Sequence, residues 1–151
     1  MLGTSSRKST KAPVARLIAS QVSATGTKTV QLRITSVMNR YPDRYRHLIV
    51  ATNGRYDCLS RIEDNVDATA VSLSHSNGRP DGSLRGINRQ IAAAAPDLLV
   101  TYNWGAIEWA MVNRVLRHVP HLHMESGFGP DEADRQLRRR VVTRRIALAR
   151  T

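Results

Sequence analysis

The feature that most constrains the fold is a regular alternation of short apolar runs with segments of helical periodicity. The runs expected to form strands are VARLIAS (14–20), RHLIVAT (46–52), ATAVSLS (68–74), DLLVTYN (97–103) and HLHMES (121–126). Apolar residues at helical spacing lie between them, at Val30, Ile34, Val37, Met38 and Tyr41, at Leu84, Ile87 and Ile91, at Ile107, Met111 and Val115, and last at Leu137, Val141 and Leu148. This alternation is typical of βαβ units, so it predicts an α/β fold around an open parallel sheet of about five strands, with helices on both faces.

The breaks between these segments are also marked in the sequence. Pro42 and Pro120 each follow a helical segment and are expected to end it. A single helical turn is expected near 56–62, and the composition of 76–82 predicts a loop. No interior linker is long enough to separate two domains. We therefore expect a flexible basic N-terminus over residues 1–12 and one domain over residues 13–151.

Cysteine content and apolar run length exclude several classes of protein. Cys58 is the only cysteine, so an internal disulfide and a cysteine zinc cluster are both excluded. A lone cysteine is compatible with a reducing compartment such as the cytoplasm. No run of about 18 apolar residues occurs, so the sequence predicts no membrane span.

The net charge of +11 suggests an anionic partner, which could be nucleic acid, an acidic membrane surface or a phosphorylated substrate. A solvated, arginine-rich surface explains the same charge. The last helical segment concentrates it, at Arg135, Arg138, Arg139, Arg140, Arg144 and Arg145. This segment could lie on an acidic membrane, although we favour a helix whose apolar side packs into the core. Nucleic-acid binding is disfavoured, because no stacking aromatics accompany the basic run.

Ligands of open α/β sheets bind at the carboxyl ends of the strands, near a switch point in strand order. The first such loop is SQVSATGTKT, where Gly26 would allow close approach of a ligand. The N–H groups of Thr27 and Lys28 would then point at an anion. The loop matches neither the dinucleotide-binding fingerprint nor the P-loop pattern. On the motif alone, an ordinary turn with Thr27 as the helix N-cap is the favoured interpretation.

The loop after the fourth expected strand, YNWGAIEWA, combines an amide with an indole. Asn103 can donate and accept hydrogen bonds, and Trp104 offers an apolar stacking face. That pairing suits a sugar ring, which has polar edges and an apolar C–H face. The alternative is that Asn103 caps the following helix and Trp104 packs locally, and both interpretations can hold together.

The fifth expected strand places His121, His123 and Glu125 on one face, which is a possible metal-binding pattern. We expect no metal, because the same face of a parallel strand normally packs against a helix that satisfies its histidines. Glu125 and Ser126 instead lie at the edge where ligands bind in this architecture. Gly127 permits a sharp turn directly after that edge.

Two segments, DLLVTYNWGAIEWAMVNR (97–114) and PHLHMESGFGPDEADRQLRRRVVTRR (120–145), carry a resemblance to a known family. The chain resembles the N-terminal, acceptor-side domain of glycosyltransferase family 4 enzymes of the GT-B fold, in layout from about residue 14 to the end. The resemblance implies a Rossmann-like domain. It also implies an enzyme that transfers sugar from a nucleotide-sugar donor without a metal or other cofactor. The active site of such enzymes lies in a cleft between this domain and a second, donor-binding domain.

The resemblance also implies roles for particular residues. Gly26 and Lys28 would contact donor phosphate, while the acceptor side would be lined by Asn103, Trp104, His123, Glu125, Ser126 and Gly127. Many family members carry His-Asp at the end of the fifth strand, where this chain has Glu125-Ser126. His123 and Glu125 are therefore rival candidates for the catalytic contact.

Because the donor-binding domain is absent, the resemblance predicts half of an enzyme that is inactive alone. It also predicts a cytoplasmic protein with a peripheral contact on the inner face of the membrane. Arg138, Arg139, Arg140, Arg144 and Arg145 would make that contact. The alternative function is a non-catalytic α/β module that docks on an anionic membrane surface or on nucleic acid.

Overall fold

The computed structural model describes residues 14–20, 28–52, 54–72, 75–76, 79–80, 83–125, 135 and 137–148. Its main strands are β1 (Val14–Ser20), β2 (Tyr45–Ala51), β3 (Ala68–Ala70), β6 (Leu98–Tyr102) and β7 (His121–Met124). Its α-helices are α1 (Lys28–Arg40), α2 (Leu84–Ala94), α3 (Ile107–Val112) and α4 (Arg138–Leu148). The expected N-terminal tail, residues 1–12, lies outside the described part.

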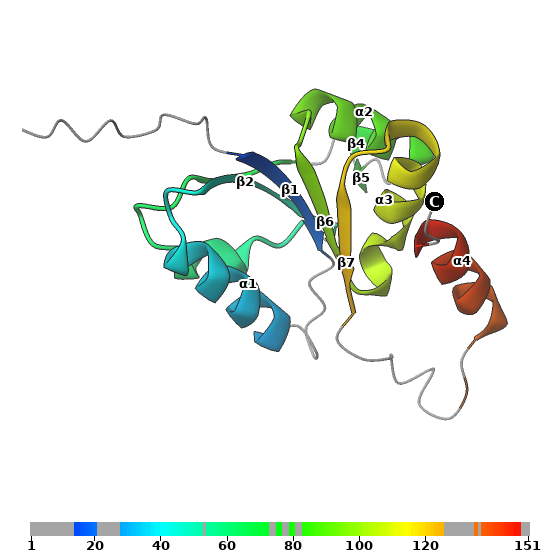
Figure 1. The fold of residues 1–151 in the computed structure, drawn as a ribbon, viewed down its shortest axis with the longest axis horizontal. Coiled ribbons are helices and arrows are strands. Elements are labelled where there is room, and N and C mark those ends of the chain that lie inside the picture. The colour runs from blue at the N-terminus through cyan, green and yellow to red at the C-terminus, as the bar shows by residue number, and fades with distance from the viewer. Residues whose placement is uncertain are drawn as a thin grey trace, which may run out of the picture.

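The five main strands form one parallel sheet in the order β3-β2-β1-β6-β7 (Figure 1). The chain builds outward from β1 to β2 and β3, and then returns to add β6 and β7 on the other side of β1. The strand order therefore reverses between β1 and β6, which is the switch point where ligands of such sheets bind. The predicted Rossmann-like α/β fold is confirmed.

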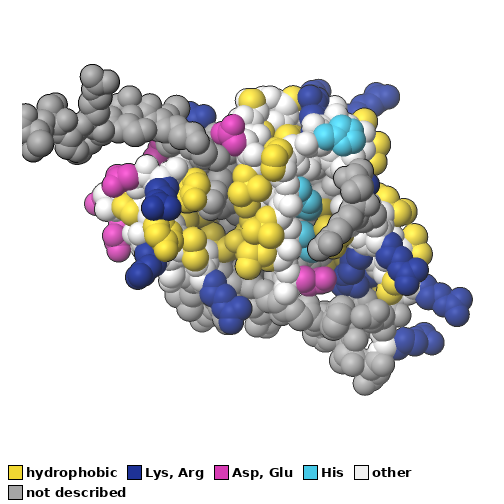
Figure 2. All heavy atoms as spheres, viewed as in Figure 1, with side chains coloured by type: hydrophobic (Ala, Val, Ile, Leu, Met, Phe, Trp, Pro, Cys, Tyr) yellow, Lys and Arg dark blue, Asp and Glu magenta, His cyan; other side chains and the backbone are white. Residues whose placement is uncertain are grey.

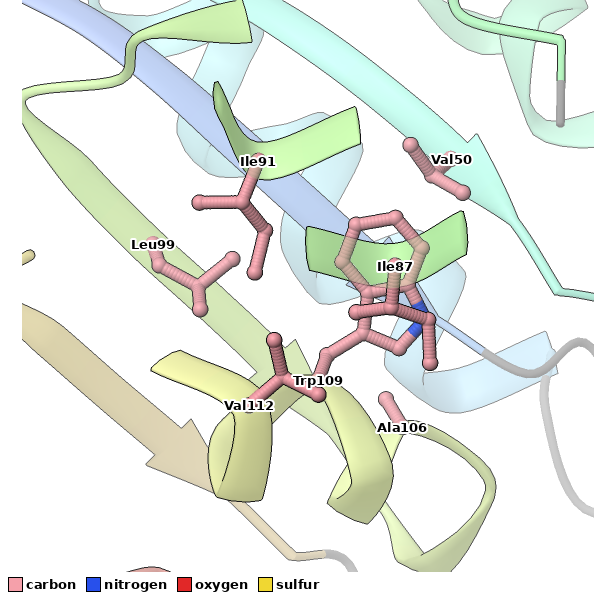
Figure 3. Close-up of a cluster of buried hydrophobic side chains, with 7 residues drawn as sticks. All are labelled: Val50, Ile87, Ile91, Leu99, Ala106, Trp109 and Val112. Atoms are coloured by element: carbon pink, nitrogen blue, oxygen red, sulfur yellow. The ribbon is translucent and has the colours of Figure 1, made fainter. Parts of the chain in front are cut away.

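The larger apolar core lies between the sheet and the pair α2 and α3 (Figure 3). It consists of Val50, Ile87, Ile91, Leu99, Ala106, Trp109 and Val112, none of them more than 3% exposed. Helix α2 begins where the side chain of Ser83 accepts a hydrogen bond from the N–H of Gly86 at 3.0 Å, a standard N-cap. The periodicity of Ile87 and Ile91 therefore marked a truly buried face.

The opposite face of the sheet is covered by α1, but only in part. Met38 packs with Ile49, Val100 and Tyr102 there. On β7, Leu122 and Met124 pair with Val100 and Tyr102 and so point to this same face, yet they remain 48% and 43% exposed. Helix α1 thus covers the centre of the sheet and leaves the β7 edge open.

Helix α4 packs beside α3, at the β7 side of the molecule (Figure 1). Ala147 is buried with Ile107 and Ala110, and Trp104 packs against that cluster. The prediction of which residues form the apolar side of this helix is only partly confirmed. Leu137 and Val141 are half-buried, whereas Leu148 is 39% exposed. The prediction that this helix docks on the domain is confirmed, through a smaller apolar contact than expected.

The third expected strand and the expected loop at 76–82 both differ from the structure. The strand ends at Ala70 rather than at residue 74, although the N–H of Val71 still donates to the carbonyl of Ile49 at 2.8 Å. The loop segment overlaps a short antiparallel pair, β4 (His75–Ser76) with β5 (Arg79–Pro80). Composition alone did not reveal this pair, because two-residue strands leave no periodic pattern.

The helix after β6 also departs from its expected face. It begins as a turn, η2 (Trp104–Ala106), continues as α3 and ends as a π-helical turn, η3 (Asn113–Arg117). A π turn changes the angular phase of its residues relative to the α-helix before it, and Val115, within this turn, is 63% exposed instead of buried. The side chain of Asn113 fixes this turn by bonding both the N–H and the carbonyl of Val119.

Candidate functional site

The carboxyl ends of β1, β6 and β7 meet at one level of the sheet. Ser20 pairs with Tyr102, and Tyr102 pairs with Met124, so the residues that follow these strands emerge side by side. Asn103 follows β6 and Glu125 follows β7. This edge lies beside the switch point, and it brings together the two sequence segments that predicted a ligand site.

Asn103 has a backbone conformation that side-chain-bearing residues rarely adopt, with φ 57° and ψ 178°. This region is occupied almost only by glycine and costs about 1–3 kcal/mol for other residues. Its N–H donates to the carbonyl of Met124 at 2.8 Å, and its carbonyl accepts from the N–H of Ala106 at 3.2 Å. Its side chain does not cap the following turn. The capping alternative for Asn103 is therefore wrong.

Two other residues with side chains have positive φ among the described residues, and both have an ordinary explanation. Ala95 and His118 adopt the left-handed conformation directly after α2 and η3, where helices commonly end in this way. Asn103 lies instead at the end of a strand beside the switch point. Strain at such a place is a recurrent property of binding sites.

Trp104 is half-buried and lies under two guanidinium groups of α4. The guanidinium carbons of Arg140 and Arg144 lie 5.0 and 5.3 Å from the centre of its ring, within the range of cation–π attraction. Arginines four residues apart on a helix share one face, so α4 presents both to the indole. The expected local packing of Trp104 is confirmed, and a sugar stacking on the same ring face would have to displace these groups.

Glu125 is held by Arg144 in a bidentate ion pair. Nη2 of Arg144 donates to Oε1 at 2.6 Å, and Nε lies 3.1 Å from Oε2 and 3.2 Å from Oε1. The two side chains are only 14% and 24% exposed, so this pair is stronger than an ordinary surface pair. Arg144 therefore links Trp104, after β6, to Glu125, after β7.

His121 and His123 face the α2–α3 side of the sheet, where both contact the hydroxyl of Thr101. Nε2 of His121 lies 2.9 Å from Oγ1 of Thr101, and Nδ1 of His123 lies 2.8 Å from the same atom. Thr101 is fully buried in the neighbouring strand. One ring nitrogen of each histidine is thus bonded within the fold through Thr101, as the packing interpretation expects, whereas Nε2 of His123 has no hydrogen-bond partner among the described residues.

Both imidazoles are disfavoured in their charged form. Burial lowers the pKa of His121 to about 4, and the neighbouring His123 adds to the effect. Burial also lowers the pKa of His123, against an opposing contribution from Glu125 and with a further lowering by Arg144. Both rings are therefore neutral near pH 7, and each can donate one hydrogen bond and accept one.

The structure does not place several of the predicted site residues at this edge of the sheet. Gly26, Ser126 and Gly127 lie outside the described residues, and Lys28 is the first residue of α1. No group of three or more His, Cys, Asp or Glu side chains that could hold a metal occurs in the described ranges.

Sequence reasoning missed Thr101 as the partner of both histidines. Its place on the neighbouring strand, level with His123, was the available signal.

The arginines of α4 divide into two groups. Arg140 and Arg144 face the protein, whereas Arg138, Arg139 and Arg145 are exposed, together with Val142 and Ile146 at 55% and 50%. Figure 2 shows basic side chains gathered over α4 with hydrophobic ones among them. None of the helices in the described part of the chain is long and apolar enough to cross a membrane.

Comparison with known proteins identifies no family. No protein-family model matches the sequence, and no curated protein matches it significantly. Among solved structures, the chain is similar to a protein described as a UDP-N-acetylglucosamine 2-epimerase from Listeria monocytogenes. That similarity has a TM-score of 0.48 and 15% sequence identity. It covers 77% of this chain and 31% of the other, so this chain spans about a third of that protein.

Proposed function

We propose that the chain is the acceptor-side domain of a GT-B glycosyltransferase that uses a nucleotide-sugar donor. The observation that carries the proposal is the strained backbone of Asn103 at the carboxyl end of β6, beside the switch point of the sheet. Strain at that position has no role in ending a helix, and it is maintained by bonds to Met124 and Ala106. The resemblance of residues 97–114 and 120–145 to family 4 enzymes supports the same function.

The side chains near Asn103 have the chemistry that a sugar acceptor requires. Sugar hydroxyls are both donors and acceptors, and they would meet the amide of Asn103, the imidazole of His123 and the carboxylate of Glu125. Arg144 holds Glu125 in place, which makes Glu125 a fixed acceptor rather than a free base. His123 is therefore the better of the two rival catalytic candidates. Donor phosphate would contact Lys28, at the start of α1, and Gly26, as the resemblance implies.

The proposal is tested by binding of methyl glycosides of glucose, mannose, galactose and N-acetylglucosamine, measured by saturation-transfer NMR. We expect at least one glycoside to receive saturation from the chain, and Asn103→Ala to reduce the signal at least threefold. Asn88→Ala is the matched control, because Asn88 lies on α2 and accepts from Arg117. Equal signals from the two variants would contradict the proposed site.

A second test concerns turnover. If the donor-binding half is required, the 151-residue chain should not transfer or hydrolyse UDP-, GDP- or ADP-linked sugars by itself. Release of the nucleoside diphosphate (UDP, GDP or ADP) above the rate of a heat-denatured control would show that this chain is more than an acceptor-side domain.

A second candidate function is docking on an acidic membrane, at the inner face in a cytoplasmic protein. It is favoured by the outer face of α4, where Val142 and Ile146 are exposed among Arg138, Arg139 and Arg145. Such a face can combine burial of apolar side chains with attraction to anionic lipid. Flotation with vesicles containing 30% phosphatidylserine tests it. Substituting the three exposed arginines with alanine should abolish flotation, and retained flotation would contradict it.

A further inference from the structure

The two histidines of β7 and the buried hydroxyl between them form one connected hydrogen-bonded group. Thr101 has one hydroxyl proton. Its oxygen, Oγ1, lies 2.9 Å from Nε2 of His121 and 2.8 Å from Nδ1 of His123. A hydroxyl can donate only one hydrogen bond. If it donates to one ring, the nitrogen of the other ring must donate to the hydroxyl oxygen. While the hydroxyl donates to either ring, the protonation of one imidazole therefore determines that of the other.

Two states of the arrangement satisfy both contacts while the hydroxyl proton is bonded to one of the rings. In the first, Nε2–H of His121 donates to Thr101, the hydroxyl donates to Nδ1 of His123, and His123 carries its proton on Nε2. In the second, Nδ1–H of His123 donates to Thr101, the hydroxyl donates to Nε2 of His121, and Nε2 of His123 holds a lone pair. The two states present opposite hydrogen-bonding character at the same atom of His123.

We propose that Thr101 joins His121 and His123 into a proton relay that sets the hydrogen-bonding state of His123 at the ligand edge of the sheet. The relay changes state when Nδ1 of His121 takes a proton from water and Nε2 of His123 gives one to a ligand hydroxyl or water bound there, or in the reverse direction. In the forward direction, Nε2 of His121 passes its proton to the oxygen of Thr101. In the reverse direction, Nδ1 of His123 does so. The hydroxyl proton moves to the opposite ring at the same time. The total number of protons and the net charge are unchanged.

The outer end of this relay lacks a partner in the described structure. Nε2 of His123 is buried, and no hydrogen-bond partner lies within reach of it among the described residues. A buried polar atom of this kind costs free energy until something bonds to it. The charged groups that act on His123 are Glu125, which directly follows β7, and Arg144 from α4. Their mutual ion pair leaves Nε2 as the group able to accept or donate a bond.

Thr101 is thus a positioning residue, because it acts on a ligand only through His123. A sugar hydroxyl can bond either state of Nε2, since it both donates and accepts. Use of the relay in sugar transfer rests on the proposed function. The relay itself does not, because it depends only on the three side chains.

The test is long-range nitrogen–proton NMR on the uniformly ¹⁵N-labelled full chain at pH 7, which distinguishes protonated from bare ring nitrogens. We expect one of the two Thr101-facing nitrogens, Nε2 of His121 or Nδ1 of His123, to carry a proton and the other to be bare. Two protonated or two bare nitrogens would overturn the relay. Rapid exchange between the two states would give both nitrogens intermediate ¹⁵N chemical shifts. These shifts would change in opposite directions as the populations of the two states change, and that result would also support the relay.

Two variants and a control separate the relay from a merely structural contact. Thr101→Ser keeps the hydroxyl and should keep the opposed protonation. Thr101→Val keeps the volume and removes the hydroxyl, so the two rings should titrate independently. The protonation of one Thr101-facing nitrogen should then no longer depend on that of the other. Thr69→Val, on the exposed strand β3, is the control and should change neither ring. If Thr101→Val retains the wild-type pattern, or Thr101→Ser loses it, the relay is wrong, whatever the glycoside experiments show.

Discussion

The interface beneath α2 and α3 and the edge formed by β6, β7 and α4 stabilise the same sheet by different means. The first is a closed apolar cluster around Leu99 and Trp109. The second contains a strained backbone at Asn103, a bidentate ion pair and a buried hydroxyl shared by two histidines. Apolar burial depends little on salt or pH, whereas the second region depends on both. The difference separates the part that carries the fold from the part that we propose for binding.

The largest effect should come from opening the apolar interface. Leu99 is fully buried, so Leu99→Ala removes its packing and leaves a cavity. We expect the free energy of unfolding to fall by about 2–5 kcal/mol in urea denaturation. Leu84→Ala is the control, because Leu84 is 55% exposed, and it should change stability by less than about 0.5 kcal/mol. Similar losses in the two variants would contradict the assigned core.

The ion pair of the second region should contribute less, and its contribution should depend on salt. Glu125→Gln keeps the shape and removes the charge that Arg144 binds. We expect a loss of about 1–2 kcal/mol, with faster amide exchange in α4. The exposed pair Arg55–Asp57 provides the contrast, since its side chains are 60% and 66% exposed, and Arg55→Ala should cost less than about 0.5 kcal/mol. A larger effect at Arg55 would reverse the comparison.

Acid should weaken the second region before the first. The folded-state pKa of His121 is about 4 and that of His123 is also lowered, whereas both are near 6.5 when unfolded. Between these values the unfolded chain binds more protons, so stability should be fully present above about pH 6.5 and fall as the pH drops toward 4. The double variant His121→Gln/His123→Gln should flatten this slope. An unchanged slope would show that other groups cause it.

The smallest effects concern backbone strain. Glycine removes the penalty of positive φ but loses more entropy on folding, so Ala95→Gly and Asn103→Gly should each stabilise by no more than about 1 kcal/mol. The two should differ in function. Only Asn103→Gly should reduce glycoside binding, because Ala95 merely ends α2. Destabilisation by Asn103→Gly beyond about 1 kcal/mol would show that its conformation is not strained.

The sequence predicted the architecture well because long periodic segments report burial directly. Ile87, Ile91 and the run Leu98–Tyr102 lie where their patterns placed them. Val115 is exposed although its spacing predicted a buried position, because a π turn is a local change of hydrogen bonding that has no signature in residue spacing. Leu122 and Met124 are exposed although apolar, because the position of α1 over the sheet cannot be read from β7 itself.

The strand ends that carry the candidate residues were predictable from the sequence, whereas the contacts of these residues were not. The ends of β6 and β7 followed from the strand pattern, and Asn103, Trp104, His123 and Glu125 do gather there. The partners Arg140 and Arg144 were first interpreted as membrane contacts. Their contact with Trp104 depends on how α4 docks, which is a tertiary property. Peripheral membrane contact stays a prediction, now for the exposed arginines alone.

The most direct test of the central claim, that the carboxyl end of β6 is the ligand site, uses the two tryptophans of the chain. Trp104 lies in the proposed site, whereas Trp109 is 3% exposed in the core. In a titration with the methyl glycosides, followed by indole N–H resonances, the resonance of Trp104 should shift and that of Trp109 should stay. A shift of Trp109 alone, or no shift at either indole up to 50-fold molar excess, would contradict the account.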